Sequence, residues 1–277
     1  MSGGSHVPAG GDRRDDASLD RSSEPASFYT GIVPLVYTAL RSRDSDDVAA
    51  CADFVARTGQ PALELGCGDG YPLLELRERG LDVHGLDSSA DMLARCRTAA
   101  SSRGIEVTLF HQAMETMTLP GTYRAIFLAG PTFNLLPDDA TASRALARIR
   151  DHLAVDGAAR IPLFVPAPLA PDHLGVPRTH TAADGMSMSV AAVAQDRDVE
   201  TRTQRTRLRY EVHVPGGTTR ILERDWLLHW YIPDGFAALA DAAGLAVRSM
   251  TTPDGDTAGV GSRDYDAVLV HPSRTVS

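Results

Sequence analysis

Two short stretches of the chain carry residues that can bind a ligand containing a ribose. Residues 63–70 read Leu-Glu-Leu-Gly-Cys-Gly-Asp-Gly, so that an acid precedes three alternating glycines. Glycine has no Cβ, which lets the chain bend sharply after a strand and lets a ligand approach the backbone. Asp87 ends the next apolar run, about 20 positions after Gly66, the spacing at which a carboxylate can accept hydrogen bonds from ribose hydroxyls. The two stretches together predict a site for a nucleoside-bearing cofactor.

The glycine spacing distinguishes between two kinds of cofactor. The dinucleotide fingerprint is Gly-x-Gly-x-x-Gly, whose third glycine lets helix and strand pack closely beneath a pyrophosphate. Here Gly70 comes one residue early, and Glu64 places a carboxylate two residues before Gly66. That charge would repel a pyrophosphate. A cationic or zwitterionic ligand without phosphate therefore fits better, and a nicotinamide dehydrogenase is disfavoured.

The surrounding pattern indicates which elements position these residues. From residue 62 to 166, short apolar runs alternate with longer amphipathic ones, as in parallel strands joined by crossover helices. Residues 71–76 predict a helix with proline near its start, and residues 81–87 predict a short buried strand. Asp87 then lies at the carboxyl end of a strand, where ligands bind in such sheets. A serine or aspartate of residues 87–89 is expected to cap the next helix.

In these motifs the chain resembles the class I S-adenosylmethionine-dependent methyltransferases. Their first motif has this acid and glycine pattern, and their second motif ends in a ribose-binding acid. The likeness covers residues 28–165 and 235–270 and is strongest to the small-molecule branch, which includes sugar amine and other natural-product methyltransferases of secondary metabolism. It implies an α/β, Rossmann-like, doubly wound and mostly parallel seven-stranded sheet, with N-terminal lid helices and an inserted small antiparallel sheet. Residues 28–41 and 46–57 are the predicted lid helices.

The resemblance also implies a binding site for S-adenosylmethionine, which would leave as S-adenosylhomocysteine. The residues expected to bind this cofactor are Tyr37, Glu64, Gly66, Cys67, Gly68, Gly70, Asp87, Ser88, Met92, Gln112, Ala113, Met114 and Ala129. The sequence departs from the family at two places. Ala113 stands where an acid often accepts the adenine amino group, and residues 155–158 replace a Pro-Gly-Gly turn. We expect Gly157 in that turn to adopt a positive φ.

Catalysis in this family depends mainly on positioning. The methyl group of a sulfonium is already activated, so an in-line nucleophile held close to it can react without a covalent intermediate. By the resemblance, Tyr37 binds the cofactor carboxylate and Tyr29 faces the acceptor; the alternative is that both are core aromatics on one amphipathic helix. Asn134, after the fourth strand, either orients the acceptor or caps its turn.

Histidines are the candidates for proton removal. His229 is the first choice for a general base because its pKa suits proton transfer near neutrality. The alternative is a histidine in the core of a sheet, which strand alternation produces without any catalytic role. His111 is expected beside the adenine, whereas His173 and His180 lie in a proline-rich connection that can reach the acceptor.

The chain changes character after residue 165. Four prolines between Pro166 and Pro177 precede three runs rich in Val, Thr, Arg and Tyr, which predict an antiparallel sheet. This insertion, residues 167–231, is expected to cover the acceptor. Seven arginines between residues 197 and 224 are matched by six acids between 196 and 225, so we expect a solvated strand face and no anion site.

Composition limits the remaining function classes. Residues 1–26 lack an apolar core and are expected to form a disordered tail, followed by a methyltransferase domain over residues 27–277. The net charge of −9 argues against a nucleic-acid partner. Three scattered cysteines, with no metal-ligand spacing, predict a reducing cytoplasm and no metal. No apolar run approaches the length of a membrane span.

We therefore expect an enzyme that transfers a methyl group from S-adenosylmethionine to a small molecule. O- or N-methylation is favoured over carbon methylation, and the identity of the acceptor stays open, as does a homodimer. The alternative from a different class is a protein that binds S-adenosylmethionine without methyl transfer, as a sensor or regulator. Ala113 keeps that alternative open.

Overall fold

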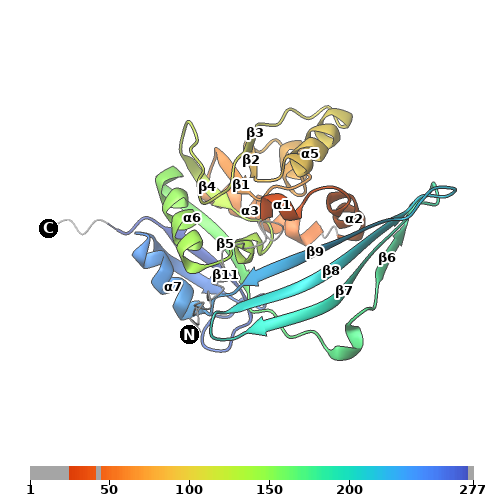
Figure 1. The fold of residues 1–277 in the computed structure, drawn as a ribbon. Helices are drawn as coiled ribbons and strands as arrows, with labels where there is room; N and C mark the ends of the chain where they lie inside the picture. The colour runs from red at the N-terminus through yellow and green to blue at the C-terminus, as the bar shows by residue number, and fades with distance from the viewer. Residues whose placement is uncertain (1–24, 42–44, 274–277) are drawn as a thin grey trace, which may run out of the picture.

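A seven-stranded sheet forms the centre of the molecule. A computed structural model describes residues 25–41 and 45–273 (Figure 1). The strand order is β10-β11-β5-β4-β1-β2-β3, in which β1 to β5 run parallel and β11 runs antiparallel to both β5 and β10. The strands are β1 (Ala62–Leu65), β2 (Val83–Asp87), β3 (Leu109–His111), β4 (Tyr123–Phe127), β5 (Leu153–Phe164), β10 (Ala246–Thr251) and β11 (Asp264–Val270).

Helices cover both faces of this sheet. Alternate residues of β1 face opposite sides of the sheet, and both sides are apolar. Leu63 and Leu65 face a core that includes the helix residues Leu146 and Phe236. Ala62 faces a second core that includes Leu93. The first face is covered by α6 (Asp139–His152) and α7 (Pro233–Ala242), and the second by α3 (Ser45–Thr58), α4 (Leu73–Glu78) and α5 (Ala90–Ser102). The predicted doubly wound, mostly parallel sheet is confirmed.

A second sheet of four antiparallel strands extends from one side of the molecule (Figure 1). Helix α2 packs against it through Val33 and Val36, which share a third core with Met188, Tyr210 and Val212. This confirms the predicted antiparallel sheet and shows that one of the two predicted lid helices packs against it. The elements are α1 (Pro25–Phe28), α2 (Val33–Leu40), β6 (Arg178–Thr181), β7 (Ser187–Asp198), β8 (Thr203–His213) and β9 (Arg220–His229), with short 3-10 helices η2 (Thr132–Leu135) and η3 (Pro171–His173). We use the word lid below for residues 25–41, which hold α1 and α2.

The lid and the layer next to it differ from the prediction in two ways. The single helix predicted over residues 28–41 is interrupted at Gly31, whose φ of +68° breaks the helical repeat. The second predicted lid helix corresponds to α3, which packs on β4 and β5 and so belongs to the helical layer of the main sheet. The lid is therefore shorter than expected.

Two strand assignments also needed correction. Gly157 lies inside β5 and has no positive φ; a Cβ there would be 2.6 Å from the Arg124 carbonyl oxygen, so close strand packing is what requires the glycine. Strand β6 was not predicted, because all four of its residues are exposed and polar and so show no alternation.

The outer face of the four-stranded sheet carries paired charges. Arg207 Nε lies 2.9 Å from Asp225 Oδ1, and Arg209 Nε lies 2.7 Å from Glu211 Oε1. The Arg209–Glu211 pair agrees with the predicted solvated strand face, whereas Asp225 is buried beneath its arginine partners.

The remaining sequence predictions concern the N-terminal tail and membrane-spanning helices. Residues 1–24 of the predicted tail lie outside the described residues. Within the described part, none of the helices combines the length and the apolar character needed to cross a bilayer.

Gly66 offers a direct test of the turn that follows β1. In Gly66→Ala the new Cβ would combine a φ of +71° with a distance of 2.8 Å to Thr132 Cγ2. Gly80→Ala is the matched control, because its φ is +79° but nothing lies within 4 Å. Left-handed backbone alone costs about 1–2 kcal/mol, so we expect a larger loss of unfolding free energy in Gly66→Ala. Urea unfolding measures this difference, and equal losses in the two variants would show that the contact with Thr132 is unimportant.

Candidate functional site

The glycine turn after β1 is fixed onto the neighbouring strand β2. The amides of Gly66 and Cys67 both donate to the Leu86 carbonyl oxygen, at 2.7 and 3.0 Å. Gly68 and Gly70 have φ values of +55° and +97°, which favour glycine. The turn therefore leaves the carboxyl end of the sheet with its backbone open to a ligand.

Asp87 ends β2 directly beneath this turn. Its Oδ2 accepts from the Gly68 amide and its Oδ1 from the Ser89 amide, both at 2.8 Å. Burial raises the pKa of Asp87, although the two backbone donors oppose that shift. Ser89 caps α5 by accepting from the Met92 amide, as predicted for this segment. Each carboxylate oxygen keeps a further lone pair, which a hydroxyl donor can use.

Glu64 is a buried acid at the end of β1. Glu64 is 1% exposed, and its Oε2 atom has no hydrogen-bond partner. Burial raises its pKa to about 8, against the attraction of the Arg41 guanidinium. A carboxyl group in this state can bind a cationic ligand group, which would restore its charge.

Asp69 joins the glycine turn to the lid. Its Oδ1 lies 2.8 Å from Arg41 Nη1, and its Oδ2 accepts from the Thr38 hydroxyl at 2.7 Å. The Arg41 guanidinium also lies over the Tyr71 ring, 4.8 Å from its centroid. A second connection links the lid to the start of α5, where the Ser89 hydroxyl donates to the Tyr29 carbonyl oxygen at 2.7 Å.

These residues surround a cavity of about 290 Å³ at the carboxyl ends of β1 and β2. Nine of the predicted site residues line it, namely Tyr29, Tyr37, Glu64, Gly66, Cys67, Gly68, Asp87, Met92 and Ala129. Arg41, Tyr71, Thr132 and Trp226 also line it but were not predicted. Five residues predicted to bind the cofactor are not among the lining residues: Gly70, Ser88, Gln112, Ala113 and Met114.

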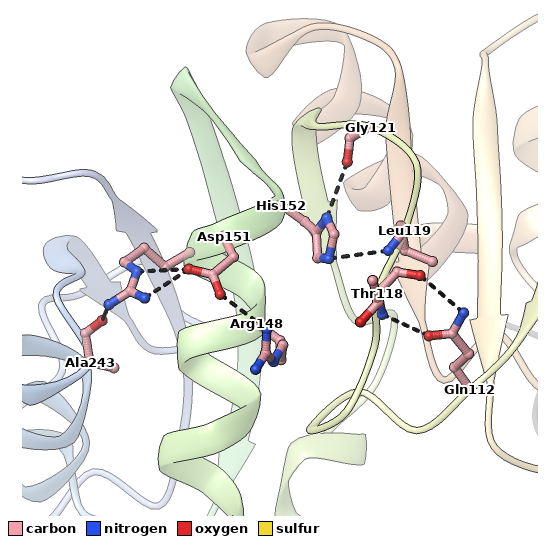
Figure 2. A network of polar contacts seen from close by, with 9 residues as sticks. Gln112, Thr118, Leu119, Gly121, Arg148, Asp151, His152 and Ala243 are labelled. Atoms are coloured by element: carbon pink, nitrogen blue, oxygen red, sulfur yellow. Dashed lines mark hydrogen bonds and ion pairs between the residues drawn. The ribbon is translucent and has the colours of Figure 1, made fainter.

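The Gln112 side chain is held by its own loop (Figure 2). Its Nε2 donates to the Thr118 carbonyl oxygen at 3.2 Å, and its Oε1 accepts from the Thr118 amide at 2.7 Å. His152 braces the same loop, with Nδ1 3.1 Å from the Gly121 oxygen and Nε2 3.3 Å from the Leu119 nitrogen. Because both ends of the amide are engaged, the structure argues against Gln112 as a cofactor ligand.

The Asn134 side chain hydrogen-bonds to backbone atoms of two strands, β5 and β9. It is fully buried, and its Nδ2 donates to the carbonyl oxygens of Phe164 and His229 at 3.0 and 2.9 Å. Its Oδ1 accepts from the Phe164 amide. The prediction that Asn134 orients the acceptor is therefore wrong, since its amide ties β5 to β9.

His229 faces away from the cavity. Trp226 and Leu228 of the same strand line it, whereas the His229 ring is 2% exposed and places Nδ1 2.8 Å from the Tyr231 hydroxyl. Burial lowers the pKa of His229. Its Nε2 lies 3.6 Å from Asp139. The prediction of His229 as general base is contradicted; the alternative, a histidine in the core, describes it better.

A second, larger cavity of about 590 Å³ lies between the lid and the four-stranded sheet. Four residues line both cavities and mark where they meet: Tyr29, Tyr37, Arg41 and Trp226. The Tyr29 and Tyr37 rings are edge to face at 5.4 Å, and burial raises the pKa of each. His173 lines the larger cavity, whereas His180, on exposed β6, does not.

Two important residues were visible in the sequence but received no role. Asp69 lies inside the glycine motif, and Trp226 lies in a predicted strand. The Trp226 Nε1 is buried without a hydrogen-bond partner, an unusual state for an indole. A polar residue between two motif glycines was the available signal for Asp69.

Comparison with known proteins agrees with this geometry. Residues 62–157 match the family model of a methyltransferase domain. A dTDP-3-amino-3,6-dideoxy-alpha-D-glucopyranose N,N-dimethyltransferase from Streptomyces fradiae is 25% identical over 166 residues, which cover 57% of this chain and 64% of that protein. The chain thus spans just under two thirds of that relative.

Solved structures show the same fold. The CcbJ methyltransferase from Streptomyces caelestis superposes with a TM-score of 0.69 at 22% identity, covering 91% of this chain and 98% of that one. The sugar N-methyltransferase KedS8 from Streptoalloteichus sp. gives 0.67 at 18% identity, covering 98% and 99%. The solved structures confirm the predicted Rossmann-like fold, and the family model places a methyltransferase domain over residues 62–157.

Removing the charge of Asp69 should loosen the lid. Asp69→Asn keeps the size but weakens the charge-assisted bond to Arg41. We expect about tenfold weaker binding of S-adenosylhomocysteine, or about 1.4 kcal/mol, by calorimetry, and faster amide exchange in residues 33–40. Asp156→Asn is the control, because it breaks an exposed ion pair with Arg124. Unchanged affinity and exchange in Asp69→Asn would contradict a role for this contact.

The raised pKa of Glu64 predicts a pH-dependent stability. Between pH 4.5 and about 8 the folded protein keeps a proton on Glu64 that the unfolded chain releases. The free energy of unfolding should therefore fall as pH rises through this window, by at most about 1.4 kcal/mol per pH unit. Urea unfolding of Glu64→Gln should lack this contribution, so the two stability curves should diverge toward pH 8. Parallel curves would contradict it.

Proposed function

We propose that this chain transfers the methyl group of S-adenosylmethionine to a nitrogen of a small molecule held between the lid and the four-stranded sheet. The observation that carries the proposal is the junction of the two cavities, where Tyr29, Tyr37, Arg41 and Trp226 line both. A donor in the smaller cavity and an acceptor in the larger one would meet at this junction. The second cavity favours an enzyme over a sensor that only binds the cofactor.

The smaller cavity fits the charged end of the proposed cofactor. Buried atoms without partners border it on two sides: Oε2 of Glu64, and Nε and Nη2 of Arg41. An unpaired buried polar group is costly, and a zwitterionic amino-acid moiety offers both complementary charges. Glu64 would bind the ammonium group, Arg41 and Tyr37 the carboxylate, and Asp87 the ribose hydroxyls. When bound, the cofactor supplies a methyl group activated by its sulfonium.

The residues at the junction suit an amine nucleophile. None of the four residues that line both described cavities is a histidine or a carboxylate. An amine can attack through its lone pair and lose its proton afterwards, whereas an alcohol needs a base during attack. Burial keeps Tyr29 and Tyr37 protonated at neutral pH, so their hydroxyls can orient the nucleophile. The related N,N-dimethyltransferase from Streptomyces fradiae supports nitrogen as the target.

The domain organisation follows from the same arrangement. The methyltransferase domain would comprise residues 27–277, and residues 167–231 would act as its acceptor-binding cap. Acceleration would come from holding the acceptor in line with the methyl group and from excluding water.

Calorimetry with S-adenosylmethionine and S-adenosylhomocysteine tests the proposal first. We expect both to bind, and Asp87→Asn to weaken binding at least about tenfold, since it loses charge-assisted hydrogen bonds to the ribose. Asp82→Asn is the control, because Asp82 lies outside the cavity and pairs with Arg77. Failure of the unmodified protein to bind either compound would refute the proposal. Methyl transfer from labelled donor to a pool of natural-product amines, but not to matched alcohols, is the expected activity.

A further inference from the structure

We propose that the acceptor has a largely apolar, uncharged body, such as an aromatic or alicyclic ring system bearing an amine, and is not a sugar linked to a nucleoside diphosphate. This inference rests on the proposed function and specifies its substrate class. Its basis is the chemistry of the larger cavity, which has a volume of about 590 Å³ and so falls within the range of about 300–1,000 Å³ typical of small-molecule sites.

The sheet side of this cavity is apolar because of strand register. Val190 pairs with Tyr210 and Ala192 pairs with Leu208 across β7 and β8. Cross-strand partners share a face, and all four of these residues line the cavity. Trp226 on β9 extends the same wall toward the cofactor.

The opposite side is apolar as well. Phe28, Val36 and Leu40 of the lid line it, and Leu169 and Val176 of the connection after β5 complete the wall. Such a surface favours apolar and aromatic ligand groups, which leave water on binding. A ribose and a diphosphate would instead lose their hydration against these apolar side chains and would depend on Arg41, His173 and Arg178 for replacement partners.

The charges near the cavity do not form a diphosphate site. Arg41 Nη1 is paired with Asp69 at 2.8 Å, and its Nε and Nη2 are the donors that we propose for the cofactor carboxylate. Arg178 donates to the Leu40 carbonyl oxygen and, like His173, is exposed to solvent, where an ion pair contributes little.

The three arginines of β8 point the other way, whereas Arg224 of β9 is the cross-strand partner of the cavity residue Leu208 and so lies on the inner face. Arg205, Arg207 and Arg209 alternate with cavity residues along β8 and pair with acids on the outer face. Strand alternation therefore separates the positive charges of β8 from the acceptor cavity.

A neutral fluorescent amine tests this class directly. N-phenyl-1-naphthylamine, added to the full chain saturated with S-adenosylhomocysteine, should give a saturable rise in fluorescence. Ala192→Phe, which fills the cavity, should weaken probe binding at least tenfold. Ala191→Phe is the matched control, because Ala191 pairs with Arg209 on the outer face, and it should bind the probe as the parent does. Thymidine diphosphate at millimolar concentration should not displace the probe.

A second pair of variants keeps the test independent of folding. Val176→Asp adds a charge at a cavity residue that is 57% exposed, and should weaken probe binding, whereas Val199→Asp, at a residue 71% exposed outside the cavity, should not. Displacement by thymidine diphosphate, or no probe binding by protein that binds S-adenosylhomocysteine, would overturn the inference. Loss of S-adenosylhomocysteine binding in the parent would instead refute the proposed function.

Discussion

The carboxylate of Asp69 is the contact on which the arrangement of both cavities depends. It lies in the glycine turn and binds Arg41 and Thr38 of the lid. Arg41 and Tyr37 line both cavities. The turn that would hold the donor therefore also fixes the position of the lid residues that line the acceptor cavity. Because Asp69 is only 7% exposed, solvent weakens this ion pair less than it would at the surface. Donor and acceptor sites are thereby built as one unit.

Buried polar atoms without partners give this unit its selectivity. Glu64 and Arg41 line the cofactor cavity, and each keeps buried polar atoms without hydrogen-bond partners. A bound ammonium group would favour the ionised form of Glu64 and a carboxylate would meet the Arg41 guanidinium, whereas a phosphate would disfavour ionisation of Glu64. The folded protein bears the cost of these atoms until a complementary ligand compensates for it.

The fold was predictable from sequence where local rules govern it. Alternating apolar runs predicted the strands, and three alternating glycines predicted a turn whose φ values are positive. Residue roles that depend on distant partners were not predictable. Asn134 is committed to Phe164 and His229, which are 30 and 95 positions away, and His229 is turned from the cavity by the alternation of β9. Asp69 lay within the motif, but its partner lies 28 positions earlier.

The four-stranded sheet separates recognition of the acceptor from the stability of the protein surface. Its inner face presents Val190, Leu208 and Tyr210 to the cavity, while the same strands carry ion pairs such as that of Arg207 and Asp225 outside. Because neighbouring residues on a strand face opposite sides, a change at an inner position leaves the outer pairs in place. The donor site depends mainly on the glycine turn and on β1 and β2; from this sheet it is lined by Trp226 and Leu228 of β9 and by no residue of β7 or β8. Acceptor preference can therefore change by substitutions along β7 and β8 without altering how the donor is held.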